Sequence, residues 1–259
     1  MTAKIPWLQP GEPFPPIHKA WNQADPAPGL LAAGGSLDVH SLMRAYTNGI
    51  FPWFSKGQPI LWWSPDPRMV LVPAQFKLHR SLRKTLTAFR ANPSCEIRFD
   101  SAFDQVIRAC SASQRPGQDG TWIVEDMVLG YQALHAAGYA HSVETWVEGE
   151  LVGALYGVAI GSAVFGESMF TRGPDASKIA LAALVAFCLQ HQVSQIDCQQ
   201  NTRHLASLGA CEVSRAQFLT TLHAATQRAA LPWKFEPVYW NLLFQPPPIT
   251  AFIDRPAAA

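Results

Sequence analysis

The clearest indication of the fold in this chain of 259 residues is residues 141–170, HSVETWVEGELVGALYGVAIGSAVFGESMF. It contains three segments rich in strand-forming residues, with a turn at residues 148–150, and this pattern is typical of an antiparallel meander. The next stretch, DASKIALAALVAFCLQHQ at residues 175–192, is apolar on nearly all sides and predicts a buried helix. Strands with helices packed across them indicate an α+β or α/β fold.

Further helices and strands are expected on both sides of this meander. The spacing of apolar residues predicts helices at 36–49, 101–111, 125–138, 202–210 and 216–227, and strands at 96–100, 193–199 and 211–215. Proline and tryptophan are frequent up to about residue 75 and rarer after it. We therefore expect a small N-terminal domain at residues 1–75 and a larger C-terminal domain at residues 76–259.

Composition narrows the class of protein. Hydrophobic residues make up 48% of the chain and charged residues 15%, which indicates a globular protein with a sizeable core. The net charge of +1 excludes a grossly basic nucleic-acid binder but leaves room for a local basic patch. An apolar signal segment and any run of 18 apolar residues are absent, so we expect a cytoplasmic protein without a membrane span. Five cysteines without a CxxC pair, and histidines without metal-ligand spacing, favour a reducing compartment and no metal.

Glu167 lies among apolar residues in VFGESMFTRGPDASK, residues 164–178. A glycine and a serine flank it, and two further hydrophobic side chains follow at once. The spacing leaves two interpretations open. Glu167 is either a solvated carboxylate in a turn, or a partly desolvated acid that binds an ammonium group or accepts a proton.

Asp197 and Gln199 lie in IDCQ, residues 196–199, at the end of an expected strand. Alternation along a strand places their side chains on the same face. As a pair they could form a relay, in which the carboxylate accepts a proton while the amide orients a substrate group. The alternative is that they cap the helix expected at 202–210.

Basic residues cluster between positions 77 and 90. Arg80, Arg83 and Lys84 fall at helical spacing, so they form either one cationic face toward phosphates or an ordinary solvated helix face. Walker and GxGxxG motifs are absent from the sequence, and the glycines of GALYGVAIG lie within an expected strand. No nucleotide-phosphate loop is therefore expected.

Ten motifs occur in one order between about residue 14 and about residue 223: GLLAAGGSL, AYTNGIFPWF, PILWWSPDPR, GTWI, LHAAGYAHSVETW, LVGALYGVAIG, FGESMF, DASK, IDCQ and HLASLGA. This series resembles the bacterial leucyl/phenylalanyl-tRNA–protein transferases, and WWSPDPR and GESMF are its more specific members. The resemblance implies an α+β protein with a small N-terminal α/β domain and a larger, N-acetyltransferase-like (GNAT-like) C-terminal domain.

The resemblance also implies an activity. Members of the family move Leu or Phe, and Met less readily, from aminoacyl-tRNA to the N-terminal Arg or Lys of an acceptor protein, which marks that protein for degradation. Because the ester is already activated, no ATP and no other cofactor are expected. The implied partners are aminoacyl-tRNA and the acceptor protein, and we expect a monomer because nothing in the pattern requires a partner chain.

The motif matches give roles to individual residues. Asp197 and Gln199 match the family's proposed proton relay to the acceptor amine, and Glu167 matches an acid near the aminoacyl ester. The basic stretch that holds the tRNA acceptor stem is matched by Arg80, Arg83 and Lys84. Positions that bind the aminoacyl group or the terminal adenosine are matched by Trp53, Trp122, Ser168, Met169, Leu181, Leu184 and Ile196.

Two other function classes compete with this one. A coenzyme A-dependent N-acyltransferase would hold its pyrophosphate on a Gly-rich turn that opens a helix, whereas GPDASK supplies one Gly followed by a Pro that lacks the backbone donor. A non-enzymatic RNA-binding module would use the Trp-rich segment and the basic helix. That module leaves Asp197, Gln199 and Glu167 without a role.

Overall fold

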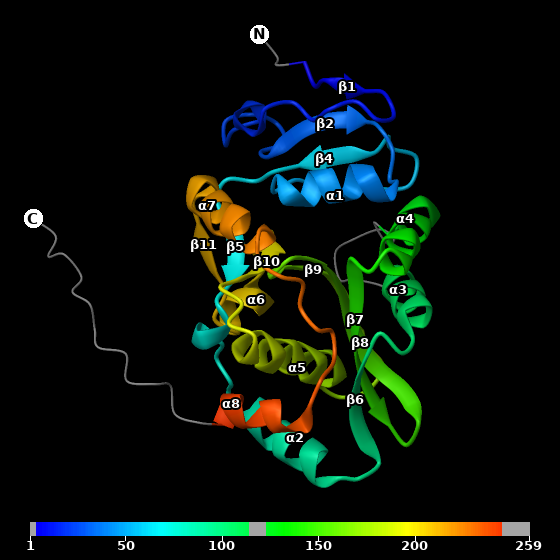
Figure 1. Ribbon diagram of the computed structural model, residues 1–259, viewed down its shortest axis with the longest axis vertical. Coiled ribbons are helices and arrows are strands. Elements are labelled where there is room, and N and C mark those ends of the chain that lie inside the picture. Colours follow the sequence, from blue (N-terminus) through cyan, green and yellow to red (C-terminus); the bar gives the residue numbers. More distant parts are fainter. Residues whose placement is uncertain (1–3, 114–122, 245–259) are drawn as a thin grey trace, which may run out of the picture.

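Within residues 4–113 and 123–244, which the computed structural model describes, the chain forms two β-sheets of different size (Figure 1). The smaller sheet has the strand order β1-β2-β4-β3, and the larger has the order β11-β5-β10-β9-β8-β7-β6. The strands of the smaller sheet are β1 (Trp7–Leu8), β2 (Leu30–Gly34), β3 (Phe51–Pro52) and β4 (Leu61–Trp63).

The meander that the sequence predicts forms the centre of the larger sheet. Its strands pair antiparallel in chain order and are β7 (Ala140–Val147), β8 (Glu150–Ile160) and β9 (Ala163–Thr171). The outer strands are β5 (Arg68–Leu71), β6 (Cys95–Phe99), β10 (Ile196–Gln199) and β11 (Cys211–Val213). The predicted α+β character, with helices beside a largely antiparallel sheet, is confirmed at this level.

One strand pair of the larger sheet is parallel. β10 pairs with β9 through Ile196 opposite Val164 and Asp197 opposite Phe165. Beyond these pairs β9 runs on to Thr171, whereas β10 ends at Gln199. The carboxyl ends of two neighbouring strands therefore lie at the same edge of the sheet, where side chains from both can meet.

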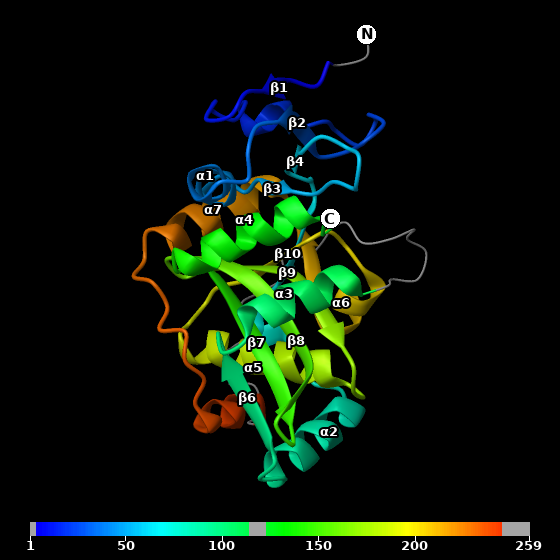
Figure 2. The ribbon, with the colours of Figure 1, turned by 90° about the vertical axis from the view of Figure 1, so that its right-hand side faces the viewer.

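Helices cover both faces of the larger sheet (Figures 1 and 2). On one face α5 (Ala176–Gln190) packs against β7 and β8, and it is buried over most of its length, as its all-round apolar sequence predicts. On the other face lie α3 (Phe103–Ala112) and α4 (Glu125–Ala136). The other helical segments are α1 (Val39–Thr47), α2 (Arg80–Ala91), α6 (Arg203–Ser207), α7 (Arg215–Thr226), α8 (Asn241–Phe244) and the 3-10 turns η1 (Ile17–Lys19), η2 (Pro73–Gln75) and η3 (Pro237–Trp240).

Two hydrophobic clusters fill the interior, and one of them joins the sheets. The first cluster contains Trp62 of the smaller sheet together with Phe165 of the larger one. The second lies under α5. The chain passes between the sheets after β4, and β5 at Arg68–Leu71 already pairs within the larger sheet. The division into domains at 1–75 and 76–259 stays a prediction.

The described part of the chain contains no helix that is long and apolar enough to cross a bilayer. Among the same residues, no group of His, Cys, Asp and Glu side chains has the arrangement of a metal site.

Candidate active site

Glu167 interrupts the regular ladder between β9 and β8. The residues on either side of it pair with consecutive residues of β8, Tyr156 and Gly157, so Glu167 has no partner there and forms a β-bulge. A Cβ at position 157 would lie 2.3 Å from the carbonyl oxygen of Phe165, which is why glycine is required at this close approach. Glu167 therefore lies in a strand and not in a turn, and its half-buried side chain points toward α1 and α4.

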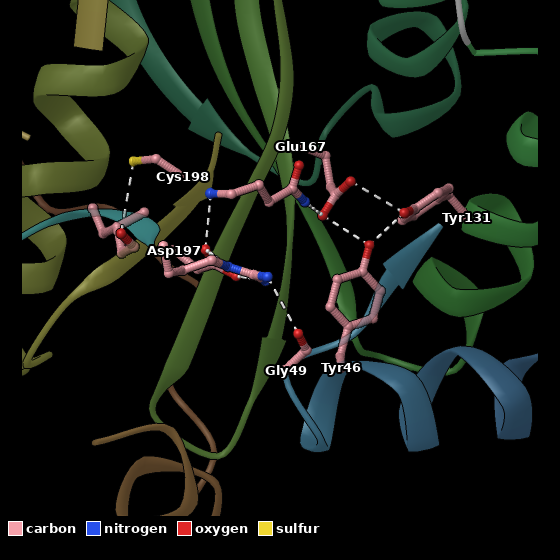
Figure 3. Close-up of polar contacts among 9 residues, drawn as sticks. Tyr46, Gly49, Tyr131, Glu167, Asp197 and Cys198 are labelled. Atoms are coloured by element: carbon pink, nitrogen blue, oxygen red, sulfur yellow. Dashed lines mark hydrogen bonds and ion pairs between the residues drawn. The ribbon is translucent and has the colours of Figure 1, made fainter. Parts of the chain in front are cut away.

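Three side chains from distant segments contact the Glu167 carboxylate (Figure 3). The Tyr46 hydroxyl of α1 lies 2.7 Å from Oε1, and the Tyr131 hydroxyl of α4 lies 3.1 Å from Oε2. The Gln199 amide of β10 donates to Oε1 at 2.7 Å. The two tyrosine hydroxyls also hydrogen-bond to each other. We call these four side chains the Glu167 network.

The surroundings of Glu167 make it a weak acid. The pKa of its carboxyl is raised from 4.5 to about 7: burial is the largest cause, the tyrosine hydrogen bonds oppose it, the negative charge of Asp197 adds to it and the positive charge of Arg68 opposes it. The pKa values of Tyr46 and Tyr131 are well above their usual value, first because both hydroxyls are buried and next because of the charge of Glu167. Both phenols therefore stay protonated, and the group that can change its protonation near neutral pH is the carboxyl.

Asp197 is buried in an ion pair with Arg68. The two side chains are only 2% and 1% exposed, and Arg68 donates from Nε to Oδ1 at 2.8 Å and from Nη2 to Oδ2 at 2.6 Å. Such a two-pronged contact between a guanidinium and a carboxylate is one of the strong forms of a charge-assisted hydrogen bond. Both carboxylate oxygens are engaged by the guanidinium, so the geometry favours an orienting role for Asp197 over a role as proton acceptor.

Asp197 also fixes the backbone of Gln199. Its Oδ1 accepts a hydrogen bond from the Gln199 N–H at 2.8 Å, and Gln199 has a φ of 63°, in the left-handed region. The alternative that this pair caps the next helix is wrong, because Thr202 caps α6 by accepting from Leu205 N at 3.2 Å. The structure therefore brings Glu167, Asp197 and Gln199 together.

The apolar residues expected to bind the transferred side chain gather in the second hydrophobic cluster, to which α5 itself contributes. Val164 of β9 also belongs to this cluster. From the expected set the cluster includes the buried Leu181, Leu184 and Ile196, with the half-buried Met169 packed against it. Tyr46 and Tyr131, which contact Glu167, belong to the first cluster.

The aromatic residues expected near the adenosine are only partly described. Trp53 follows β3 directly, is half-buried, and packs edge-to-face on Trp63 with ring centroids 5.4 Å apart. Ser168, beside Glu167, is buried. Trp122 lies outside the described residues.

The predicted basic helix exists, but its cations do not share one environment. The side chains of Arg80, Arg83 and Lys84 are all exposed on α2. Arg83 lies over the ring of Phe244, with its guanidinium carbon 5.2 Å from the ring centroid. In both views α2 lies at the end of the molecule farthest from the smaller sheet (Figures 1 and 2).

Sequence reasoning missed Tyr46, Tyr131 and Arg68 as site residues. Both tyrosines fall within segments expected to be helical, 36–49 and 125–138, and a phenol hydroxyl buried on a helix face needs a hydrogen-bond partner. That need was the available signal. Arg68 opens the apolar run RMVLV, and a charge at the start of a buried strand also requires a partner.

Comparison with known proteins identifies the family. The family profile described as leucyl/phenylalanyl-tRNA protein transferase matches residues 70–223, and the profile of that family's N-terminal domain matches residues 35–66. A solved structure of a functionally unknown conserved protein from Staphylococcus epidermidis aligns with a TM-score of 0.34 and 10% identity, covering 71% of this chain and 68% of that chain. A likeness that weak supports no conclusion about the fold.

Curated relatives extend this match over nearly the whole chain. The protein from Polaromonas sp. (strain JS666) is 65% identical over 237 residues, which are 92% of this chain and 93% of the relative. Proteins from Albidiferax ferrireducens and Leptothrix cholodnii are 61% and 59% identical, covering 93% and 92% of this chain and 95% of each relative. All three are named leucyl/phenylalanyl-tRNA–protein transferase. The chain therefore belongs to the leucyl/phenylalanyl-tRNA–protein transferase family.

Proposed function

We propose that this protein transfers Leu or Phe from aminoacyl-tRNA to the N-terminal Arg or Lys of acceptor proteins, with Glu167 as the group that accepts the proton. Family membership supports the reaction. The observation that carries the role of Glu167 is its position in a network of Tyr46, Tyr131 and Gln199, with a pKa of about 7. Addition of Leu or Phe marks the acceptor for degradation.

The chemistry requires one proton to move. The neutral α-amine of the acceptor attacks the ester carbonyl, a C–N bond forms, and the C–O bond to the ribose of the terminal adenosine breaks. The nitrogen loses a proton, and the departing ribose oxygen gains one. A carboxyl with a pKa of about 7 can accept the first proton and supply the second, because neither protonation state is strongly favoured at neutral pH.

The Glu167 network accommodates both states. When the carboxyl is ionised, it accepts hydrogen bonds from Tyr46, Tyr131 and Gln199. Three oxygen-to-oxygen contacts link Glu167 and the two tyrosines, and the two phenols supply only two protons for them. A protonated carboxyl supplies the third, so each contact then contains a proton. Proton uptake therefore breaks no hydrogen bond in this network.

The other residues bind and orient the substrates in this proposal. Asp197 acts through the backbone of Gln199 rather than as a base, since Arg68 engages both of its oxygens. The transferred side chain is bound by Met169, Leu181, Leu184 and Ile196. The terminal adenosine is bound by Trp53, Trp122 and Ser168, and the tRNA phosphates by Arg80, Arg83 and Lys84.

The finer features of the fold and setting belong to the same proposal. The parallel pair β9–β10 within a largely antiparallel sheet supports a GNAT-like catalytic domain. We further propose a monomeric, cytoplasmic protein that needs no cofactor.

The test mixes purified protein with Phe-charged tRNA and a peptide beginning with Arg, and mass spectrometry follows the gain of one Phe. Wild type and Glu212→Gln, an exposed carboxylate on β11, should transfer equally. Glu167→Gln should lower kcat about a hundredfold or more, because it removes the proton acceptor. In wild type, kcat should rise with pH through about 7 as the carboxyl ionises.

Two results would reject the proposal at different levels. Mass gain from an acyl-CoA but not from charged tRNA would replace the reaction by coenzyme A chemistry. Full activity of Glu167→Gln, with an unchanged pH profile, would remove Glu167 from proton transfer and leave the reaction standing.

A further inference from the structure

We infer that Arg68 is a positioning residue for the transfer reaction, which holds the Gln199 side and the Tyr46 side of the Glu167 network from a single buried guanidinium. This inference rests on the proposed function, because it concerns the same site. Arg68 belongs to β5, which pairs with both β10 and β11. It touches neither Glu167 nor, in the proposal, a substrate atom.

The first connection runs through Asp197. Arg68 donates two hydrogen bonds to the Asp197 carboxylate, and that carboxylate accepts the N–H of Gln199. The left-handed φ of 63° at Gln199 is uncommon for a residue with a side chain, so this hydrogen bond helps to hold it there. From that backbone the Gln199 amide reaches Glu167 Oε1 at 2.7 Å.

The second connection runs through the end of α1. Arg68 Nη1 donates to the carbonyl oxygen of Gly49 at 3.2 Å (Figure 3). Gly49 lies just beyond Asn48, the C-cap of α1, and donates its own N–H to the carbonyl oxygen of Tyr46 at 3.0 Å. The guanidinium thereby fixes the helix end that carries Tyr46, whose hydroxyl contacts Glu167.

The guanidinium itself has little freedom. Its carbon lies 4.7 Å from the ring centroid of Phe51 in β3 and 4.6 Å from that of Phe218 in α7. With these rings and the Asp197 carboxylate around it, Arg68 is 1% exposed. Phe51 belongs to the smaller sheet, so the cation also ties that sheet to the strands that carry the site.

Lysine is the informative replacement for Arg68, because it keeps the positive charge but lacks the planar guanidinium. Only the guanidinium can donate at once to both oxygens of Asp197 and to the carbonyl oxygen of Gly49. A purely electrostatic role would survive Arg68→Lys, and a positioning role would not. Asp197→Asn keeps the shape of the carboxylate and removes its charge. Since that charge raises the pKa of Glu167, this variant should also lower the apparent pKa of the pH profile.

The experiment measures kcat, KM for charged tRNA, the pH profile of kcat and the melting temperature of the full chain. Arg68→Lys and Asp197→Asn should each lower kcat about tenfold or more while KM stays within about twofold. The double variant should be no slower than the slower single variant, because the two residues act as one unit. The matched control is Asp100→Asn, which weakens the pair between Asp100 and His141 in the same sheet and should leave kcat and the pH profile unchanged.

Each outcome decides the matter. If Arg68→Lys folds and has the kcat of wild type, the inference is overturned. It is also overturned if the activity of Arg68→Lys falls only in proportion to its unfolded fraction and Asp100→Asn loses as much activity. If Arg68→Lys does not fold, Asp197→Asn decides through kcat and its pH profile, and a wild-type result there also overturns it. Failure of the wild-type protein to transfer Phe would instead reject the proposed function.

Discussion

Replacing Glu167 by Gln should change how the stability of the protein depends on pH. The folded state raises the pKa of this carboxyl from 4.5 to about 7, chiefly by burial. Between these values the folded state binds a proton that the unfolded state has already released, so the free energy of unfolding decreases as pH rises. This contribution is fully present below the unfolded pKa and is lost as pH passes through the folded pKa.

The size of the effect follows from the shift. At about 1.4 kcal/mol per pKa unit, the change from 4.5 to about 7 corresponds to about 3.5 kcal/mol. About 2.5 kcal/mol of this should be lost between about pH 5 and about pH 8. Because Glu167 is half-buried rather than fully buried, these values are upper limits.

Urea unfolding followed by tryptophan fluorescence at several pH values measures the effect. The quantity to compare is the difference between wild type and Glu167→Gln, because His191 and His204 also titrate in this range. Their pKa values are lowered by burial, so they contribute stability that rises with pH, and this contribution cancels in the difference. If the free energy of unfolding of wild type and of Glu167→Gln changed equally with pH, the pKa of Glu167 would not be raised. The reason for treating Glu167 as a proton acceptor near neutral pH would then be lost.

Two further predictions concern the bulge and the basic helix. Gly157→Ala should destabilise the protein by about 3 kcal/mol and lower kcat, because its Cβ would collide with the Phe165 carbonyl oxygen at 2.3 Å. The control in thermal melting is Gly173→Ala, whose Cβ would meet only ordinary van der Waals contacts. Equal stability of the two variants would contradict the prediction. Arg80→Ala with Lys84→Ala should weaken binding of charged tRNA and reduce the slope of log affinity against log salt by about two, measured by filter binding, whereas an unchanged slope would place these cations on an ordinary solvated face.

Much of the fold could be predicted from local sequence patterns. The meander at 141–170 and the all-apolar helix at 175–192 appear at nearly the expected bounds, because alternation and all-round burial leave direct signatures in a sequence. The order of strands in the larger sheet could not be predicted in this way. β5 lies between β10 and β11, and those pairings join residues more than a hundred positions apart.

Motif matches supplied part of the candidate site, and the rest could be found only from the packing of distant segments. Glu167, Asp197 and Gln199 were identified from motif matches, and spacing alone left a turn and a helix cap as alternatives. Tyr46 and Tyr131 look like core residues in sequence, and only the meeting of α1, α4 and the bulge shows that their hydroxyls share one carboxylate. No local pattern encodes such a meeting.

The hydrogen bonds of the site join residues that are 32, 36, 121 and 129 positions apart, which has a consequence for synthesis and folding. During translation Tyr46, Arg68, Tyr131 and Glu167 are all synthesised before Gln199. Such long-range contacts form late, because each requires a large loop of chain to be closed. The Glu167 network can therefore assemble only after synthesis of the chain has passed Gln199.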